Sequence, residues 1–347
     1  MDLHRIFPQG AGGRNGVSTE TATPRGPHAE SARLAFDRGE RDRGERPTSR
    51  GTTREGTTAR GRKPKTLTIG RIGLYGFVVV AAAFFLLPAV VMVLTSLKSM
   101  PEIRDGSIFA LPQSLDLSAW AKAWSSACTG LDCEGIRVGF WNSVIITVPS
   151  TIASIAAGAL LGYALSFWRV KGADILFAVL LLGAFLPYQI FLYPMVRAFS
   201  MVGLYNTLSC IVIVHVIFGL PIMTLIFRNF YAGLPVELFN AARVDGGGFF
   251  RIFWNVMLPM STPILIVAAI LQITNIWNDF ILGLVFAGRD NLPMTVQLNN
   301  VVNSTYGERE YNLNMAATIL TAAVPLLVYF VSGRWFVRGI AAGAVKG

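Results

Sequence analysis

Residues 234 to 248 read Leu-Pro-Val-Glu-Leu-Phe-Asn-Ala-Ala-Arg-Val-Asp-Gly-Gly-Gly, and they predict a short helix that ends abruptly. Pro235 suits the first helical turn, and Glu237 lies close to the positive end of the helix dipole. The glycines Gly246 to Gly248 permit the left-handed backbone that ends many helices. The pair Ala241-Ala242 keeps one surface thin enough for close contact with another protein. An ordinary helix lying at a membrane interface also fits these residues.

This short helix lies between two of six long apolar stretches. A helix needs about 20 mostly apolar residues to cross a bilayer, and the stretches that meet this length are 72–96, 142–168, 174–199, 205–229, 263–287 and 314–336. The composition agrees, because 53% of the 347 residues are hydrophobic and 14% are charged. The sequence therefore predicts an all-α membrane protein with six transmembrane helices, the third of them kinked at Pro187 and Pro194.

Basic residues in the connections predict how these helices are oriented. Cytoplasmic connections are enriched in Lys and Arg, and three segments that six spans would place on one side carry such residues: Arg169, Lys171, Arg228, Arg243, Arg251, Arg334, Arg338 and Lys346. The segments 99–140 and 289–313, on the other side, mix acidic and basic residues without a basic excess. We therefore expect both termini in the cytoplasm.

The N-terminal tail differs from the rest of the chain. Residues 1–71 hold fifteen Lys and Arg against eight Asp and Glu, and so supply +7 of the net charge of +10. Because the tail has almost no aromatic or periodic apolar residues, we expect residues 1–65 to be a disordered basic cytoplasmic tail and 66–347 to be the membrane domain. Membrane lipid is the expected neighbour of the tail, and nucleic acid is not, because no recognition module accompanies it.

The three cysteines and His215 lead to different predictions. Cys128 and Cys133 fall in an outward loop on the oxidising side, where they are free to form a disulfide or to remain thiols. Cys210 and His215 lie in an apolar run and are read as packing residues. Because we find no metal-ligand spacing and no nucleophile–base arrangement, we expect no metal, no cofactor and no catalytic residue.

The loop around residues 230–262 resembles the signature loop of binding-protein-dependent ABC importer permeases. That pattern is Glu-Ala-Ala, three residues, Gly, and a distant Ile-x-Leu-Pro. The matching residues are Ala241, Ala242, Gly246, Leu258 and Pro259, with Ile252 displaced from the usual Ile position. Arg243-Val-Asp245-Gly246 looks like the sugar-importer version. Asn240 departs from the pattern, because the family usually has Glu there. An uncharged amide at this position does not form the ion pair with the ATPase that a glutamate could form.

The resemblance implies the type I ABC importer permease fold, in which this loop is a coupling helix seated in a groove on a cytoplasmic ATPase. The C-terminal segment 336–347 resembles the tail of maltose-type permeases, which contacts the ATPase dimer, although a basic flank after the last span is an alternative. The implied ATPase-coupling residues are Glu237, Asn240, Ala241, Ala242, Arg243, Asp245, Gly246 and Lys346. Because the chain has no phosphate-binding loop, we expect ATP hydrolysis in a partner subunit and no enzyme activity here.

Polar residues interrupt the fifth apolar stretch and are the candidate substrate path: Gln272, Asn275, Trp277, Asn278 and Asp279. Polar groups are costly in hydrocarbon, so they should face protein or a water-filled path. Amides and a carboxylate beside an indole ring suit a sugar, because hydroxyls need hydrogen-bond partners while the apolar face of the sugar ring stacks on the aromatic ring. Polar contacts that join neighbouring helices are the alternative.

The resemblance extends over residues 70–347 and is nearest to the second permease subunit of glucose/mannose importers. Three segments carry this narrower likeness: Trp141-Asn-Ser143, Cys128-Thr-Gly-Leu-Asp-Cys133 and Tyr311-Asn-Leu-Asn-Met-Ala-Ala317. It implies a place in the cytoplasmic membrane of a bacterium. It also implies a heterodimer with a related permease, an ATPase dimer, an extracytoplasmic sugar-binding protein and glucose/mannose-type cargo. Alternatives are another solute, such as an oligosaccharide or glycerol phosphate, and a stand-alone secondary transporter.

Overall fold

The computed structural model describes residues 69–344 except residues 131, 169 and 304–308, and it leaves the side chains of Ile69 and residues 334–344 undescribed. The expected tail at 1–65 and the coupling residue Lys346 lie outside the described residues. The described residues belong to one compact unit.

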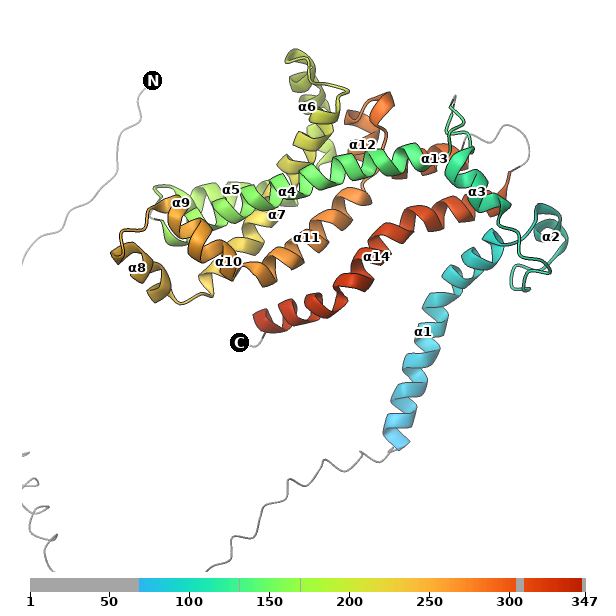
Figure 1. Cartoon of the computed structure of the whole chain (residues 1–347), viewed down its shortest axis with the longest axis horizontal. Coiled ribbons are helices and arrows are strands. Elements are labelled where there is room, and N and C mark those ends of the chain that lie inside the picture. The colour runs from blue at the N-terminus through green and yellow to red at the C-terminus, as the bar shows by residue number, and fades with distance from the viewer. Residues whose placement is uncertain (1–68, 131, 169, 304–308, 345–347) are drawn as a thin grey trace, which may run out of the picture. The chain divides into compact units, whose positions relative to one another are not determined.

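Every regular element among the described residues is a helix (Figure 1). In chain order they are α1 (Ile69–Ser96), α2 (Met100–Asp105), α3 (Ser118–Ser125), α4 (Arg137–Phe167), α5 (Ala173–Phe185), α6 (Gln189–Met201), α7 (Leu208–Ala232), α8 (Val236–Val244), α9 (Phe249–Ile252), the π-helical turn η1 (Phe253–Met257), α10 (Leu258–Met260), α11 (Thr262–Trp277), α12 (Ile281–Phe286), the 3₁₀ turn η2 (Arg289–Asn291), α13 (Met294–Asn303) and α14 (Tyr311–Ala344).

Four of these helices are long and apolar enough to cross a membrane: α1, α4, α7 and α14. Two further pairs qualify if each bent pair counts as one span, namely α5 with α6, bent by 107°, and the segment Phe249–Met260 with α11, bent by 79°. The described residues thus contain four to six candidate spans, and the expected all-α membrane fold is confirmed.

The third and fifth predicted spans are each divided between two helices. The 174–199 stretch breaks between α5 and α6, where Leu186 adopts an extended backbone before Pro187, because proline disfavours the helical conformation of the residue that precedes it. The 263–287 stretch breaks after Trp277, and α12 begins four residues later at Ile281.

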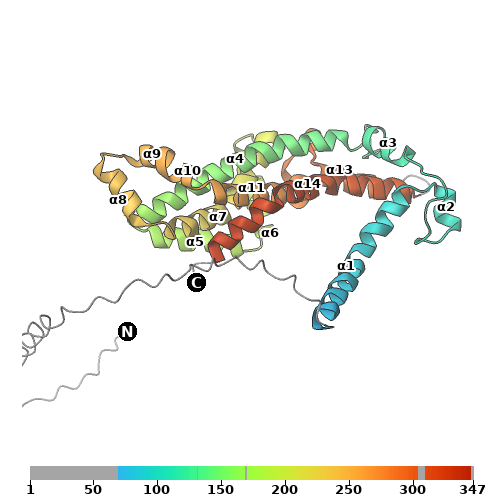
Figure 2. The same cartoon turned by 60° about the horizontal axis from the view of Figure 1, so that its bottom comes forward.

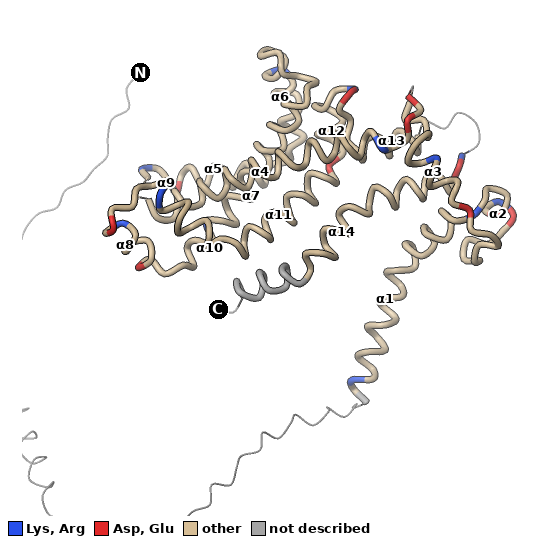
Figure 3. The backbone as a smooth tube through the Cα atoms, viewed as in Figure 1, with Lys and Arg blue, Asp and Glu red and all other residues tan. Residues whose placement is uncertain are grey.

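The long helices, which Figure 2 shows from a second direction, carry most of their charged residues at their two ends (Figure 3). One end carries α8 and α9, and the other carries α2, α3 and the loops around α12 and α13, whereas the long helices between them are almost free of charge in Figure 3. A long apolar middle with charged ends is what a bilayer requires of a protein that spans it. The chain is an integral membrane protein.

Helices α4 and α7 pack closely because α4 presents glycines to α7. A Cβ atom added at Gly162 of α4 would lie 2.8 Å from the backbone nitrogen of Arg228 and 2.9 Å from Cβ of Phe227. A Cβ added at Gly158 would collide with Met223 of α7. The segment Gly158-Ala-Leu-Leu-Gly162 is a G-x-x-x-G pattern, which lets helix backbones approach in a membrane. Buried hydroxyl residues extend this glycine seam along α4: Ser143, Thr147, Ser150, Thr151 and Ser154.

Replacing Gly162 with leucine should destabilise the protein, because the side chain has no room between α4 and α7. We expect a loss of at least about 1–3 kcal/mol, the usual cost of overpacking, seen as a fall of several degrees in the unfolding midpoint in detergent. Gly73→Leu is the matched control, since a Cβ there meets no atom within 4 Å. Equal midpoints for the two variants would contradict the packing described.

Candidate functional site

The predicted short helix is present as α8, and it begins and ends at the residues that the sequence indicated. Pro235 precedes the first turn, Glu237 lies in that turn, and Arg243 lies in the last one. Beyond the helix, the backbone N–H of Asp245 donates to the carbonyl of Ala241 (3.0 Å), and Gly246 has a φ of +76°. Only glycine adopts this left-handed conformation without strain, so Gly246 sets the direction in which the chain leaves α8.

The inner face of α8 is anchored in an aromatic cluster. Phe239 is 8% exposed and stacks on Phe167 with ring centroids 4.9 Å apart. Its ring also lies 5.7 Å from Trp168 at the end of α4. The hydroxyl of Tyr163 donates a hydrogen bond to the carbonyl of Phe249 (3.2 Å), so α9 joins the same cluster. Through this cluster, α8 is packed against the ends of α4 and α9.

The opposite face of α8 is open. The predicted coupling residues Glu237, Asn240, Ala241, Arg243, Asp245 and Gly246 are exposed, and Ala242 is half-buried. Val236 and Val244 are 51% and 88% exposed on the same helix. The guanidinium of Arg243 lies 4.6 Å from the centre of the Trp168 ring, a cation–π contact that restricts its position. The open face of α8 therefore consists of small and apolar side chains, with charged side chains at the end of the helix.

A cavity of about 1270 Å³ lies among α5, α6, α7, α11, α12 and α14. Three of the residues predicted to line a substrate path do line it: Asn275, Asn278 and Asp279. Aromatic rings form much of its remaining wall, including Tyr188, Phe191, Phe218, Phe280 and Tyr329. The cavity thus combines amide and carboxylate groups with apolar ring faces.

Gln272 and Trp277, the other two residues predicted for a substrate path, do not line this cavity. Gln272 is 2% exposed, and its side-chain nitrogen donates to the hydroxyl of Ser154 on α4 (3.2 Å). The Trp277 indole N–H donates to the carbonyl of Thr321 on α14 (3.0 Å). Both therefore join helices, as the alternative interpretation held. The reason is helical geometry, because neighbouring polar residues on α11 point to different faces.

Asp279 lies at the break between α11 and α12 and fixes the start of α12. Its carboxylate accepts hydrogen bonds from the backbone N–H groups of Leu282 (3.4 Å) and Gly283 (2.9 Å). His215 of α7 also lines the cavity, and its Nε2 lies 3.9 Å from Oδ2 of Asp279. Sequence reasoning read His215 as a packing residue, and no local signal links it to a residue on another helix.

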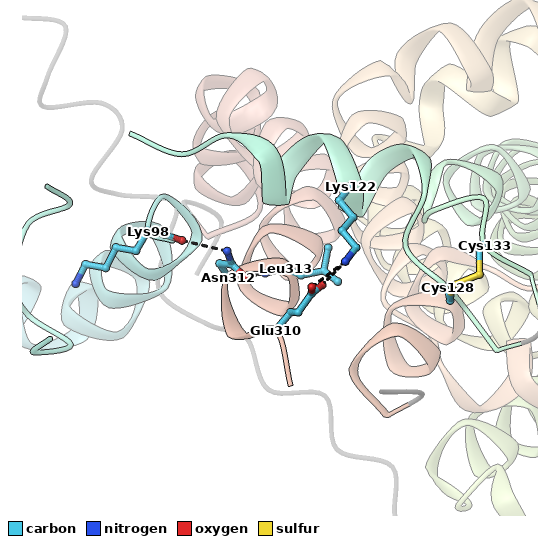
Figure 4. Close-up of polar contacts among 7 residues, drawn as sticks. All are labelled: Lys98, Lys122, Cys128, Cys133, Glu310, Asn312 and Leu313. Atoms are coloured by element: carbon cyan, nitrogen blue, oxygen red, sulfur yellow. Dashed lines mark hydrogen bonds and ion pairs between the residues drawn. A yellow bond between two sulfur atoms is a disulfide. The ribbon is translucent and has the colours of Figure 1, made fainter. Parts of the chain in front are cut away.

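Polar contacts join the segments at the opposite end of the helices (Figure 4). Lys122 of α3 forms an ion pair with Glu310 (2.6 Å), and the side-chain amide of Asn312 donates to the carbonyl of Lys98 (3.1 Å). Cys128 and Cys133 are joined by a disulfide. Asp132 within that small loop forms an ion pair with Arg289 (3.4 Å). The loop after α3 is thereby held against the loop after α12.

One carboxyl at this end of the helices has a shifted pKa. Hydrogen bonds from the side chain and backbone N–H of Ser118 lower the pKa of Asp116, and the N–H bond is 2.8 Å long. Asp116 is half-buried and precedes α3, so it stays ionised where the preceding loop enters that helix.

Comparison with known proteins gives a consistent result. Residues 140–342 match the family described as binding-protein-dependent transport system inner membrane component. The chain is 38% identical over 224 residues to the alpha-glucoside transport system permease protein AglG of Rhizobium meliloti, which covers 62% of this chain and 58% of AglG. It is 30% identical over 284 residues to the arabinooligosaccharides transport system permease protein AraQ of Halalkalibacterium halodurans, covering 81% of this chain and 96% of AraQ.

A further relative and a solved structure agree. The osmoprotective compounds uptake permease protein GgtD of Synechocystis sp. is 35% identical over 218 residues, covering 62% of this chain and 72% of GgtD. The fold is similar to a chain of a bacterial ABC transporter that imports the acidic polysaccharide alginate, with a TM-score of 0.64 and 20% identity over 79% of this chain and all of that one. With its family pattern spanning more than half of its length, the chain belongs to the inner membrane components of binding-protein-dependent transport systems.

Proposed function

We propose that this chain is the transmembrane permease subunit of an ATP-driven importer that carries sugar into a bacterial cell. The observation that carries the proposal is α8, a helix whose inner face is fixed by Phe239 in an aromatic cluster and whose outer face is open. Such an element is suited to transmit the movement of a docked ATPase, because the cluster connects it rigidly to longer helices. Membership of the binding-protein-dependent family supports the same function.

In this proposal α8 and its neighbouring loop face the cytoplasm and rest on one subunit of an ATPase dimer. A second, related permease completes the membrane part, and an extracytoplasmic binding protein delivers the cargo. Closure of the ATPase pulls α8, which opens the cavity outward, and hydrolysis of ATP in the partner subunits resets it inward. The exposed Arg243 and Asp245 are the candidates for polar contacts with the ATPase.

Sugar as cargo is supported by the chemistry of the cavity and by the relatives. Exposed amides of Asn275 and Asn278, together with the Asp279 carboxylate, supply hydrogen-bond partners for hydroxyl groups, and the aromatic wall supplies apolar faces. AglG and AraQ are described as permeases for alpha-glucosides and arabinooligosaccharides. Glucose/mannose-type monosaccharide is the proposed cargo, on the resemblance carried by residues 128–133, 141–143 and 311–317.

An oligosaccharide is the second candidate cargo. The cavity, at about 1270 Å³, exceeds the range of about 300–1,000 Å³ that is usual for small-ligand sites, so more than one sugar ring fits within it. The names of AglG and AraQ favour the same class. A stand-alone transporter is disfavoured, because the family works with a binding protein.

Gly246→Val should uncouple ATP hydrolysis from transport in the assembled importer. Valine is strained at a φ of +76°, so α8 would leave the loop in a different direction and meet the ATPase wrongly. We expect sugar uptake to fall at least tenfold while ATP hydrolysis continues. Gly248→Val is the matched control, because its φ is −82° and no atom lies within 4 Å of an added Cβ. Unchanged uptake in the Gly246 variant would refute the coupling role.

Phe239→Ala should also weaken the coupling of ATP hydrolysis to sugar transport, but by loosening α8 from α4. Removing a buried aromatic ring costs about 3–5 kcal/mol of packing, which would loosen α8 from α4. The expected result is more ATP hydrolysed per sugar transported. Leu238→Ala, at an adjacent position that is 42% exposed, should leave this ratio near that of the unmodified chain. The idea fails if the two variants give the same ratio.

Deleting the gene should abolish high-affinity uptake of one sugar. Labelled glucose, mannose, maltose and glycerol phosphate, each supplied at low concentration, form the panel. Selective loss of glucose or mannose uptake would support the monosaccharide proposal, whereas loss of maltose uptake alone would favour the oligosaccharide. Selective loss of glycerol phosphate uptake would replace sugar by another solute and leave the permease role intact.

A further inference from the structure

His215 and Asp279 come together on the wall of the cavity from separate helices. The distance of 3.9 Å between Nε2 and Oδ2 is too long for a direct hydrogen bond, which requires about 2.7–3.2 Å. Among the residues that the structure describes, this carboxylate is the only polar group paired with the His215 ring. The ring is 4% exposed, and a buried polar group without a hydrogen bond is costly. The pair is therefore incomplete as it stands.

The Asp279 carboxylate is held in place but not saturated. Two backbone N–H groups, from Leu282 and Gly283, fix it at the start of α12. A carboxylate accepts about four hydrogen bonds, so acceptor capacity remains on the side that faces the cavity. Its side chain is 13% exposed, and it is named among the residues that line the cavity.

A hydroxyl group satisfies both partners at once. It accepts a hydrogen bond from a protonated Nε2 and donates its own proton to the carboxylate, which only a group with both functions does. The side-chain amides of Asn275 and Asn278 are exposed in the same wall and make no hydrogen bond with other described residues. They provide partners for further hydroxyls of the same molecule.

The charge of the wall selects against anions. The described residues that line the cavity include Asp279 but no Lys or Arg. A carboxylate or phosphate on the cargo would meet this negative charge without a compensating cation, in surroundings where water screens poorly. Aromatic rings such as Tyr188 and Phe218, whose centroids are 5.9 Å apart, suit the apolar face of a neutral sugar ring.

We propose that His215 and Asp279 form a subsite in which one hydroxyl of a neutral polyhydroxylated cargo bridges the imidazole and the carboxylate. This proposal rests on the proposed function and deepens it. It assigns His215 a direct part in cargo selection, and it predicts that the importer handles neutral sugars in preference to sugar acids and sugar phosphates.

The test uses the complete importer, purified with its partner subunits and binding protein and reconstituted in lipid vesicles. Uptake of the neutral sugar identified in the gene-deletion panel is compared with uptake of each of its monodeoxy analogues. The unmodified complex should transport one analogue at least tenfold more slowly than the parent sugar. In His215→Leu, uptake of the parent sugar should fall to the level of that analogue, so the difference between the two disappears. The binding protein is the same in both assays, and its own preference therefore cancels in the comparison.

Three further variants separate a cargo contact from a packing effect. His215→Gln keeps a donor near the Nε2 position and should retain most of the discrimination. Asp279→Asn keeps an acceptor for one of the two α12 N–H groups but loses the charge, and should weaken discrimination against the same analogue. Met195→Leu, on the apolar wall of the cavity, should change neither ratio. If His215→Leu does not assemble, the Gln and Asn variants decide the question.

The His215–Asp279 subsite and the proposed importer function would be overturned by different results. An analogue ratio that is the same in the unmodified complex and in the His215 and Asp279 variants would overturn the subsite while leaving the sugar importer intact. Preference for glycerol phosphate or a uronic acid over every neutral sugar would also overturn the subsite and leave the permease role. A reconstituted complex that transports no sugar at all would instead overturn the proposed function, and the subsite with it.

Discussion

The rest of the structure depends on the close contact between α4 and α7. Gly158 and Gly162 allow the two backbones to approach where any larger residue would collide with Met223, Phe227 or the backbone of Arg228. In a membrane, apolar side chains gain little by leaving lipid, so close packing and polar contacts between helices supply much of the specificity. The glycine seam therefore determines where the ends of both helices lie, and the features at those ends follow from it.

Two functional features share these helices. The C-terminal end of α4 carries Tyr163, Phe167 and Trp168, which pack against Phe239 and hold α8. The α7 helix carries His215, which lines the cavity. A displacement of α8 thus acts on helices that are packed directly against the cavity wall. This arrangement gives the proposed coupling a contiguous physical route through packed side chains rather than through a flexible connection.

The helix α11 shows how polar residues in one apolar segment serve different purposes. Gln272 and Trp277 satisfy their donors on α4 and α14, and they tie three helices together. Asn275 and Asn278 face the cavity, where, in the proposed function, their polar groups meet water or cargo rather than hydrocarbon. Asp279 ends this pattern by bonding to the first turn of α12, so the break in the fifth apolar segment is stabilised by its own side chain.

The sequence by itself determined that the chain is a membrane protein and where its apolar segments lie, because these follow from the length and composition of each segment. It also determined the start and end of α8, because Pro235 and Gly246 act on the backbone within a few residues. Pro187 predicted a kink but not a bend of 107° between α5 and α6. The pattern Gly158-x-x-x-Gly162 is a sequence signal for the α4–α7 contact, although the sequence analysis did not use it. Only the tertiary structure decided which polar residues of α11 face the cavity and that His215 lies beside Asp279. An apolar helix has no strongly polar face to fix its rotation, so its rotation, and every contact between distant residues, depends on how all the helices pack together.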